Sequence, residues 1–340
     1  MLTGLPTAPA LVVFLASALV SLSASWLLVT RLERLAGRAG LSEGLLGLLA
    51  ALAADAPEIT AAVTALSHGQ ASVGAGVTLG SNVFNLAALL GLGAVVAGRV
   101  GLHRKAVVLT GVVGAWIAAA SLLAVTGVLT PAGGLAVIAV IFVPYMIILA
   151  THGRRLLPAV SVPRWLATWM TEAVAEEEAE LEEAIQPGPG AHADAAVAAA
   201  ALLVVVLAST VMELTATSVG HRFAVPGIIT GGIVLAAVTS LPNAVAAVYL
   251  ATRGRGAAVL STALNSNALN VIAGLLIPAA ITGLGSPSTQ TTLVTGWYAG
   301  LTAAVLVAAF AGRGLRRPAG SAIIAAYAVF LAALLAVAYG

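Results

Sequence analysis

Two similar segments, one in each half of the chain, constrain its fold more than any other feature. The first contains Pro57-Glu58 and ends in Gly80-Ser81-Asn82-Val83-Phe84-Asn85; the second contains Pro242-Asn243 and ends in Asn265-Ser266-Asn267-Ala268-Leu269-Asn270. In both, the final asparagine follows the proline by 28 positions. Each copy also places its proline and a Ser-x-x-x-Asn pattern inside apolar sequence. This shared spacing indicates an internal duplication.

The composition places these segments in a membrane. The chain has 340 residues, of which 60% are hydrophobic and 8% charged, and its mean hydropathy is +1.07. Such values are typical of polytopic membrane proteins and not of soluble domains. A spanning helix needs about 20 apolar residues. Stretches of this kind lie near 8–30, 42–67, 72–98, 105–126, 131–152, 194–218, 226–250, 256–283, 292–311 and 319–339. We therefore expect an all-α polytopic membrane protein with ten transmembrane helices.

The basic residues predict the orientation of these spans. Fourteen of the fifteen fall in the loops after the first, third, fifth, seventh and ninth spans, and only Arg222 falls on the other side. The positive-inside rule puts those loops in the cytoplasm and both termini outside. With five spans in each half, the second half enters the membrane in the opposite orientation. The sequence thus predicts two inverted five-helix repeats, 1–152 and 193–340, joined by a cytoplasmic linker over 153–192.

The linker is the one long polar connection. It contains a glutamate-rich run from Glu172 to Glu183, followed by Pro187-Gly188-Pro189-Gly190. The run lacks the glycine-turned pattern of a calcium-binding loop, so a solvated acidic helix is favoured over a regulatory cation site.

At the other end of the first repeat, no basic residue precedes the stretch 8–30. We therefore expect that stretch to be retained as a span and not removed as a signal peptide.

Oxygen-bearing side chains gather around the two prolines. Because proline has no N–H, Pro57 leaves the carbonyl of Ala53 without its helical partner, and Pro242 does the same to Val238. A bilayer tolerates such groups only where they face protein or water. We expect both prolines to break their spans and both carbonyls to face a cavity. The side chains expected to bind a cation there are Asp55, Glu58, Ser81, Asn85, Thr239, Ser240, Asn243, Ser266 and Asn270.

These side chains indicate which kind of ion the cavity would take. They supply carboxylate, hydroxyl and amide oxygens without sulfur or imidazole, a set that suits Na⁺ and Ca²⁺ better than zinc or copper. Asp55 and Glu58 are three residues apart and so share a helix face. Acids inside a span indicate function, although single Ser, Thr or Asn residues also serve as contacts between helices. Glu213, near the outer end of the sixth span, either reaches water or takes part in gating or ion access.

At these motifs the sequence resembles the calcium/cation antiporter superfamily, and within it the prokaryotic sodium/calcium-exchanger-like membrane proteins. The resemblance is carried by Gly40-Leu41-Ser42-Glu43, Pro57-Glu58, Gly80-Ser81-Asn82-x-x-Asn85 and Thr239-Ser240-Leu241-Pro242. It implies a ten-span exchanger whose repeat glutamates bind Ca²⁺, while neighbouring hydroxyl, amide and carbonyl oxygens help to hold Na⁺.

The chain also departs from the pattern of that family. Ala54-Asp55 stands where Thr-Ser is usual, Asn243 stands where the second repeat has its glutamate, Asn265 replaces a glycine, and Asn270 stands where an aspartate can occur. Both central carboxylates therefore come from the first repeat. We predict that Asp55 compensates for the acid missing at position 243.

The interpretation that follows is a secondary-active cation antiporter in the plasma (inner) membrane. It would exchange Na⁺ and Ca²⁺, or another cation, by alternating access at a midplane site built from spans 2, 3, 7 and 8. Proton-coupled exchange and a cation channel, which uses similar oxygens, are the alternatives. We expect no enzyme, since the chain has neither a phosphate-binding loop with lysine nor a His-Glu-x-x-His motif. We expect no cofactor, no nucleic acid and no obligatory protein partner, only the lipid bilayer and the transported inorganic cations.

Overall fold

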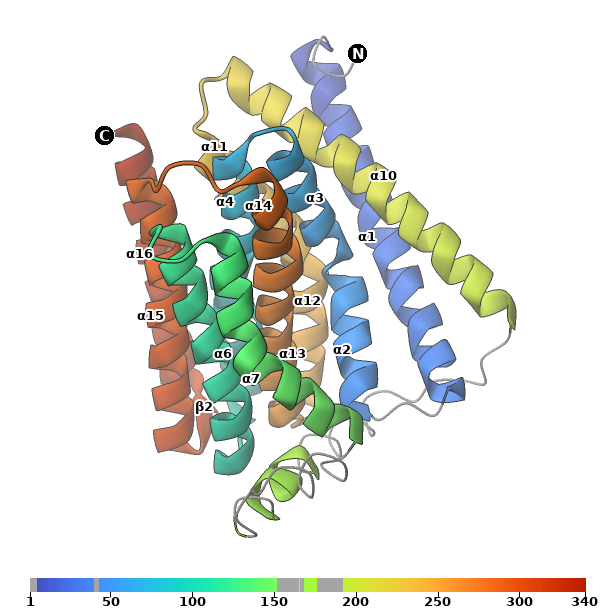
Figure 1. Cartoon of the computed structure of the whole chain (residues 1–340), viewed down its shortest axis with the longest axis vertical. Coiled ribbons are helices and arrows are strands. Elements are labelled where there is room, and N and C mark those ends of the chain that lie inside the picture. The colour runs from blue at the N-terminus through green and yellow to red at the C-terminus, as the bar shows by residue number, and fades with distance from the viewer. Residues whose placement is uncertain (1–4, 40–42, 152–164, 166–167, 176–191) are drawn as a thin grey trace.

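The computed structural model describes residues 5–39, 43–151, 165, 168–175 and 192–340, and over these ranges the chain is almost entirely helical (Figure 1). In chain order the helices are α1 (Thr7–Arg38), α2 (Glu43–Ala54), α3 (Ala56–Ser67), α4 (Ala71–Asn85), α5 (Gly93–Ala97), α6 (Arg104–Val125), α7 (Pro131–Thr151), α10 (His192–Arg222), α11 (Gly227–Ile229), α12 (Ala236–Thr252), α13 (Gly256–Leu269), α14 (Ile277–Thr282), α15 (Thr289–Gly312) and α16 (Arg317–Tyr339). The π-helical segments η2 (Leu86–Leu92), η3 (Thr230–Leu235) and η4 (Asn270–Leu276) continue α4, α11 and α13.

The described helices account for every stretch predicted to span the membrane. Nine helical stretches of the described residues, three of them containing a π-helical segment, are long and apolar enough to cross a bilayer, and the pair α2–α3 supplies a tenth if it is counted as one span. The acidic run and the Pro-Gly breaker of the predicted linker lie mostly outside the described residues. Of that run, Glu172 is described, and it forms an ion pair with Lys105.

The two prolines act differently on their helices. The chain bends by 56° between α2 and α3, with Asp55 at the break and Pro57 in the first turn of α3. By contrast, α12 runs through Pro242 without a break. The prediction that both prolines break their spans is therefore right for Pro57 and wrong for Pro242. In the second copy the irregularity in the span is the π-helical segment η3, directly before α12.

The carbonyl that Pro57 deprives of its helical partner finds a donor on a neighbouring helix. The hydroxyl of Ser25 in α1 donates to the carbonyl oxygen of Ala53 at 2.9 Å and to that of Ala54 at 3.3 Å. Ser25 is buried. An unpaired carbonyl away from water costs free energy, and the hydroxyl of the neighbouring helix satisfies it. This hydrogen bond ties α1 to the bent span.

A small sheet is present in addition to the expected helices. Strands β1 (Arg99–Gly101) and β2 (Gly314–Arg316) pair antiparallel, with Arg99 opposite Arg316. The loops that follow the third and ninth spans therefore meet at one end of the bundle. α1 begins and α16 ends at the opposite end (Figure 1). This arrangement agrees with the basic loops sharing one side and the termini sharing the other.

The duplicated segments lie at the centre of the bundle. In the apolar stretches of the spans that contain α4 and α13, 78% and 72% of the residues are buried, against 17% in α16. Glycines allow the close packing: a Cβ on Gly80 would overlap the carbonyl of Gly232 in η3. The backbones of α4 and η3 therefore touch, and this contact brings the Ser81 motif of the first half next to α12 of the second half.

Candidate cation site

Two acidic side chains lie buried at the break between α2 and α3. Asp55 occupies the break itself and is 0% exposed, while Glu58 is in the first turn of α3 and is 1% exposed. The two carboxyl groups interact electrostatically. Within the described ranges, neither takes part in an ion pair with a basic side chain. Burying two ionised acids without a cation is costly, so a bound positive charge would stabilise them.

Each carboxyl group is held by donors from the second half of the chain. Asn243 Nδ2 donates to Asp55 Oδ1 at 2.7 Å, and Ser266 Oγ donates to the same oxygen at 2.8 Å. Ser240 Oγ donates to Glu58 Oε1 at 2.7 Å. The structure thus brings the two acids of the first copy onto the proline turn and the asparagine motif of the second copy.

The other oxygen of each carboxyl group, Asp55 Oδ2 and Glu58 Oε2, is buried without a hydrogen-bond partner. Further buried oxygens without a partner belong to Thr78, Ser81, Asn85 and Asn270. Native proteins rarely leave buried oxygen atoms unpaired. A cluster of carboxylate, amide and hydroxyl oxygens of this kind is what a hard cation requires, and Ca²⁺ takes about 6–8 oxygen ligands.

Thr78 was not predicted from the sequence, because it precedes the Gly80–Asn85 motif, but its unpartnered oxygen adds it to the candidate ligands. It precedes Ser81 by three positions, and Asn85 follows Ser81 by four, so the three side chains occupy one face of α4. The helical spacing was the available signal, because it extends the Ser81–Asn85 pair by one turn.

Asparagines connect α4 with α13 and η4 beside the acids. Asn85 Nδ2 donates to Ser266 Oγ at 3.0 Å and to Asn267 Oδ1 at 3.1 Å. Asn82 and Asn267 donate to each other's backbone carbonyls at 3.0 and 3.2 Å, and Asn270 Nδ2 donates to Asn82 Oδ1 at 3.2 Å. Asn82 and Asn267 were not among the predicted site residues. The signal that could have found them is their equal position in the two copies of the motif.

Two predicted residues lie differently from expectation. Thr239 is buried, but its hydroxyl donates to the carbonyls of Leu235 and Ala236 in its own helix, at 2.9 and 3.4 Å, and no hydrogen bond links it to the acids. Glu213 is 0% exposed, so the interpretation that its side chain reaches water is wrong. The other predicted residues are all buried, and hydrogen bonds join most of them to the acids or to the asparagine network.

The family model for the sodium/calcium exchanger protein matches residues 9–152 and 194–336. The chain belongs to this family. The protein is therefore a multi-pass membrane protein of an ion-transporting, antiporting family, and the resemblance seen in its motifs is confirmed. No curated protein sequence matches it significantly.

Solved structures share the fold of this chain. The H⁺/Ca²⁺ exchanger CAX is similar with a TM-score of 0.68 at 16% identity, covering 96% of this chain and 87% of CAX. The sodium-calcium exchanger NCX_Mj, soaked with 2.5 mM Na⁺ and 0.1 mM Sr²⁺, is similar with a TM-score of 0.60 at 16% identity, covering 96% of this chain and 99% of NCX_Mj. At this identity the likeness concerns the fold.

Proposed function

We propose that this protein is a secondary-active antiporter that exchanges Ca²⁺ for Na⁺ at the site around Asp55 and Glu58. The observation that carries this proposal is the pair of buried carboxyl groups, each with one oxygen unpartnered, among neutral oxygens that also lack partners. One divalent ion neutralises both carboxylates, and so do two monovalent ions. The unloaded doubly charged site is costly at the bilayer centre, and so is a site carrying both loads. Either load therefore permits the alternation of access, and the two loads exclude each other.

In this proposal Glu58 is the primary ligand and Asp55 the second acid. Ser81, Asn85, Thr78 and Asn270 would complete the shell with neutral oxygens. Ser240, Asn243 and Ser266 would orient the carboxylates from the second half, through the hydrogen bonds of 2.7–2.8 Å described above. Thr239 would contribute only through an oxygen lone pair, because its hydroxyl hydrogen is engaged with its own helix.

We also propose that the two halves are inverted repeats, with 153–192 as the cytoplasmic linker and both termini outside, in the plasma membrane. The family model matches two segments of nearly equal length, on either side of that linker. The asparagine pair Asn82–Asn267 supports the same arrangement, since equal positions of the two copies meet reciprocally. The meeting of β1 with β2 supports a common side for the basic loops.

Coupling to protons is the second candidate. The unpartnered oxygens Asp55 Oδ2 and Glu58 Oε2 can each take a proton, and two protons neutralise the site as two Na⁺ ions do. The solved relatives are named for both kinds of coupling, Na⁺ in NCX_Mj and H⁺ in CAX. The fold is therefore compatible with either ion.

Radiolabelled Ca²⁺ uptake into proteoliposomes tests the proposal. Vesicles loaded with Na⁺ and diluted into Na⁺-free medium should accumulate Ca²⁺, whereas vesicles loaded with choline should not. An outward proton gradient in choline should give no uptake if Na⁺ is the coupling ion, and uptake if H⁺ is. Ca²⁺ flux that is equal under all gradients would indicate a channel and contradict the proposal.

A further inference from the structure

A third acid is buried in the membrane region of the exchanger, away from the central site. Glu213 lies in α10 and is 0% exposed. Its Oε1 accepts a hydrogen bond from Thr217 Oγ1 at 2.9 Å, while its Oε2 is buried and has no partner. Asp194, at the start of the same helix, is paired with Arg31 at 2.6 Å. No basic side chain of the described residues forms such a pair with Glu213.

The contacts of α10 place Glu213 between the central site and the outer surface. Thr210 precedes Glu213 by three positions, on the same face of α10, and its hydroxyl lies 3.3 Å from that of Thr64 in α3. Thr64 follows Glu58 by six residues, which is about 9 Å along a helix. His68, exposed at the end of α3, is within electrostatic reach of Glu213. Glu213 lies one further turn along α10 from Thr210, so the acid is in the outer half, about two to three helical turns beyond Glu58.

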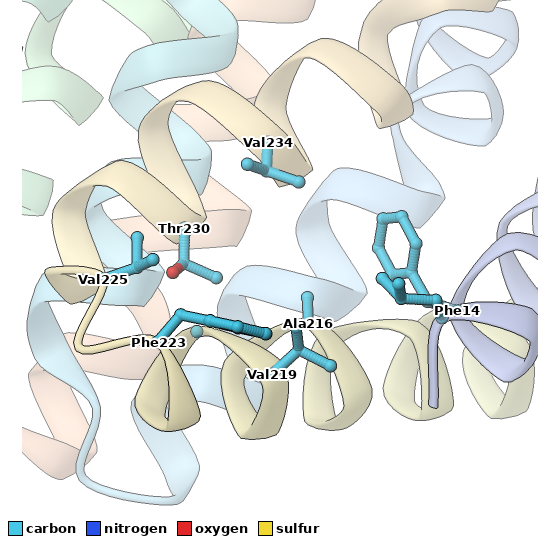
Figure 2. Close-up of a pocket in the computed structure, with 9 residues that line it drawn as sticks. Phe14, Ala216, Val219, Phe223, Val225, Thr230 and Val234 are labelled. Atoms are coloured by element: carbon cyan, nitrogen blue, oxygen red, sulfur yellow. The ribbon is translucent and has the colours of Figure 1, made fainter. Parts of the chain in front are cut away.

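Apolar side chains close this position off in the present conformation. Phe14, Met212 and Ala216 are buried in a cluster with the alanines of α3. One turn further out, on the same face of α10, is a pocket of about 140 Å³ lined by Ala216, Gly220 and Phe223. Figure 2 shows Phe14 beside Ala216 at one end of this pocket and Phe223 further along α10. Small residues on α10 leave the space, while the aromatic rings keep it apolar.

The groups around Glu213 match the chemistry of the central site at half its charge. The hydroxyl of Thr217 bonds to the carboxylate, whose other oxygen is open, and the hydroxyls of Thr64 and Thr210 meet one turn of α10 away on the same face. Such a set suits a hard cation, and a single carboxylate binds it more weakly than two. A cation that crosses the outer half of the bilayer without a counter-charge meets a large barrier.

We propose that Glu213, with Thr64, Thr210 and Thr217, forms an outer cation site that the transported ion occupies on its way between external water and the central site. This inference rests on the proposed function, because only a transported cation would use the site. Its carboxylate raises the local concentration of cations on the outer side alone. The proposal therefore predicts an effect that depends on the side from which the cation arrives.

The test is Glu213→Gln, measured in right-side-out and in inverted membrane vesicles. Glutamine keeps an acceptor for Thr217 but removes the charge. The half-saturating Ca²⁺ concentration at the external face should rise about tenfold, as expected when one attracting charge is lost from an ion path. At the cytoplasmic face it should change less than about twofold. Glu213→Asp, which keeps the charge, should restore most of the external affinity.

Glu33→Gln is the matched control. It removes one carboxylate near the C-terminal end of α1, on the proposed cytoplasmic side, and should leave the external half-saturating Ca²⁺ concentration unchanged. Equal half-saturation for Glu213→Gln and wild type at the external face would overturn the outer site, and so would an equal change at both faces. Wild type that shows no exchange at all would instead overturn the proposed function. If Glu213→Gln does not fold, Thr210→Val makes the same comparison, with an expected external rise of about threefold from the loss of one neutral ligand.

Discussion

Exchange of the acid between positions 55 and 243 tests how this site is built. Asn243 Nδ2 touches Asp55 Oδ1 at 2.7 Å, so a carboxylate placed at position 243 would enter almost the same volume from the opposite helix. In Asp55→Ser the charge is lost, and Asn243 and Ser266 lose their shared acceptor. In Asp55→Ser with Asn243→Glu, one carboxylate again faces Glu58, now from the second half of the chain.

The expected loss of Ca²⁺ affinity follows from the charges. Removing one partner of a buried charge pair costs about 3–5 kcal/mol, because the remaining charge is left uncompensated. With a bound divalent ion, Asp55→Ser leaves one such charge, so the dissociation constant for Ca²⁺ should rise by between about 10² and about 4 × 10³-fold. The double variant should recover at least about tenfold of this loss.

Calorimetric titration of the purified variants with Ca²⁺, together with Ca²⁺ uptake in proteoliposomes, measures both effects. Asn243→Glu alone is the control, because it carries three acids and should bind Ca²⁺ no more weakly than wild type. Wild-type affinity and transport in Asp55→Ser would refute the reasoning. A double variant no better than the single one would show that Asp55 does not replace the acid missing at position 243.

Further predictions concern single positions. Glu58→Gln should keep the helical circular dichroism of wild type but lose Na⁺-dependent Ca²⁺ uptake, since a neutral amide compensates the cation poorly; normal uptake would remove Glu58 from the mechanism. Ser25→Ala should lower the free energy of unfolding by about 1–3 kcal/mol, because the carbonyl of Ala53 loses its donor. Ser25→Thr, which retains the hydroxyl, should remain within error of wild type in thermal unfolding, and equal loss in both would contradict the capping role. A single cysteine at position 180 should resist an impermeant maleimide added outside intact cells, whereas one at position 286 should react. Strong external labelling at position 180 would show that the predicted orientation in the membrane is wrong.

Much of the fold was predictable because the bilayer imposes its own length and polarity on the chain. Ten apolar stretches were expected, and each coincides with a described helix or helix pair. The bend at Asp55 was also predictable from Pro57. Pro242 has the same covalent effect, yet α12 stays unbroken through it. Whether a proline bends its helix depends on tertiary packing, which local sequence does not specify.

The site was predictable in its composition but not in its connections. The paired motifs indicated the residues that meet at the centre, including Asp55, Ser240 and Asn243. No pattern in the sequence indicates that Ser25 donates to the carbonyl of Ala53, since the two residues are on different helices 28 positions apart. The burial of Glu213 was missed for the same reason: closeness to the end of a span suggests access to water, whereas the packing of α10 against α1 and α3 determines it.

The central claim is that Na⁺ and Ca²⁺ exclude each other at one site. Equilibrium binding of radiolabelled Ca²⁺ to the purified exchanger over a series of Na⁺ concentrations tests it most directly. The account predicts that Na⁺ raises the half-saturating Ca²⁺ concentration without lowering the amount bound at saturation, and that saturating Ca²⁺ displaces bound radiolabelled Na⁺. Bound Na⁺ that stays constant as the site fills with Ca²⁺ would contradict a shared site.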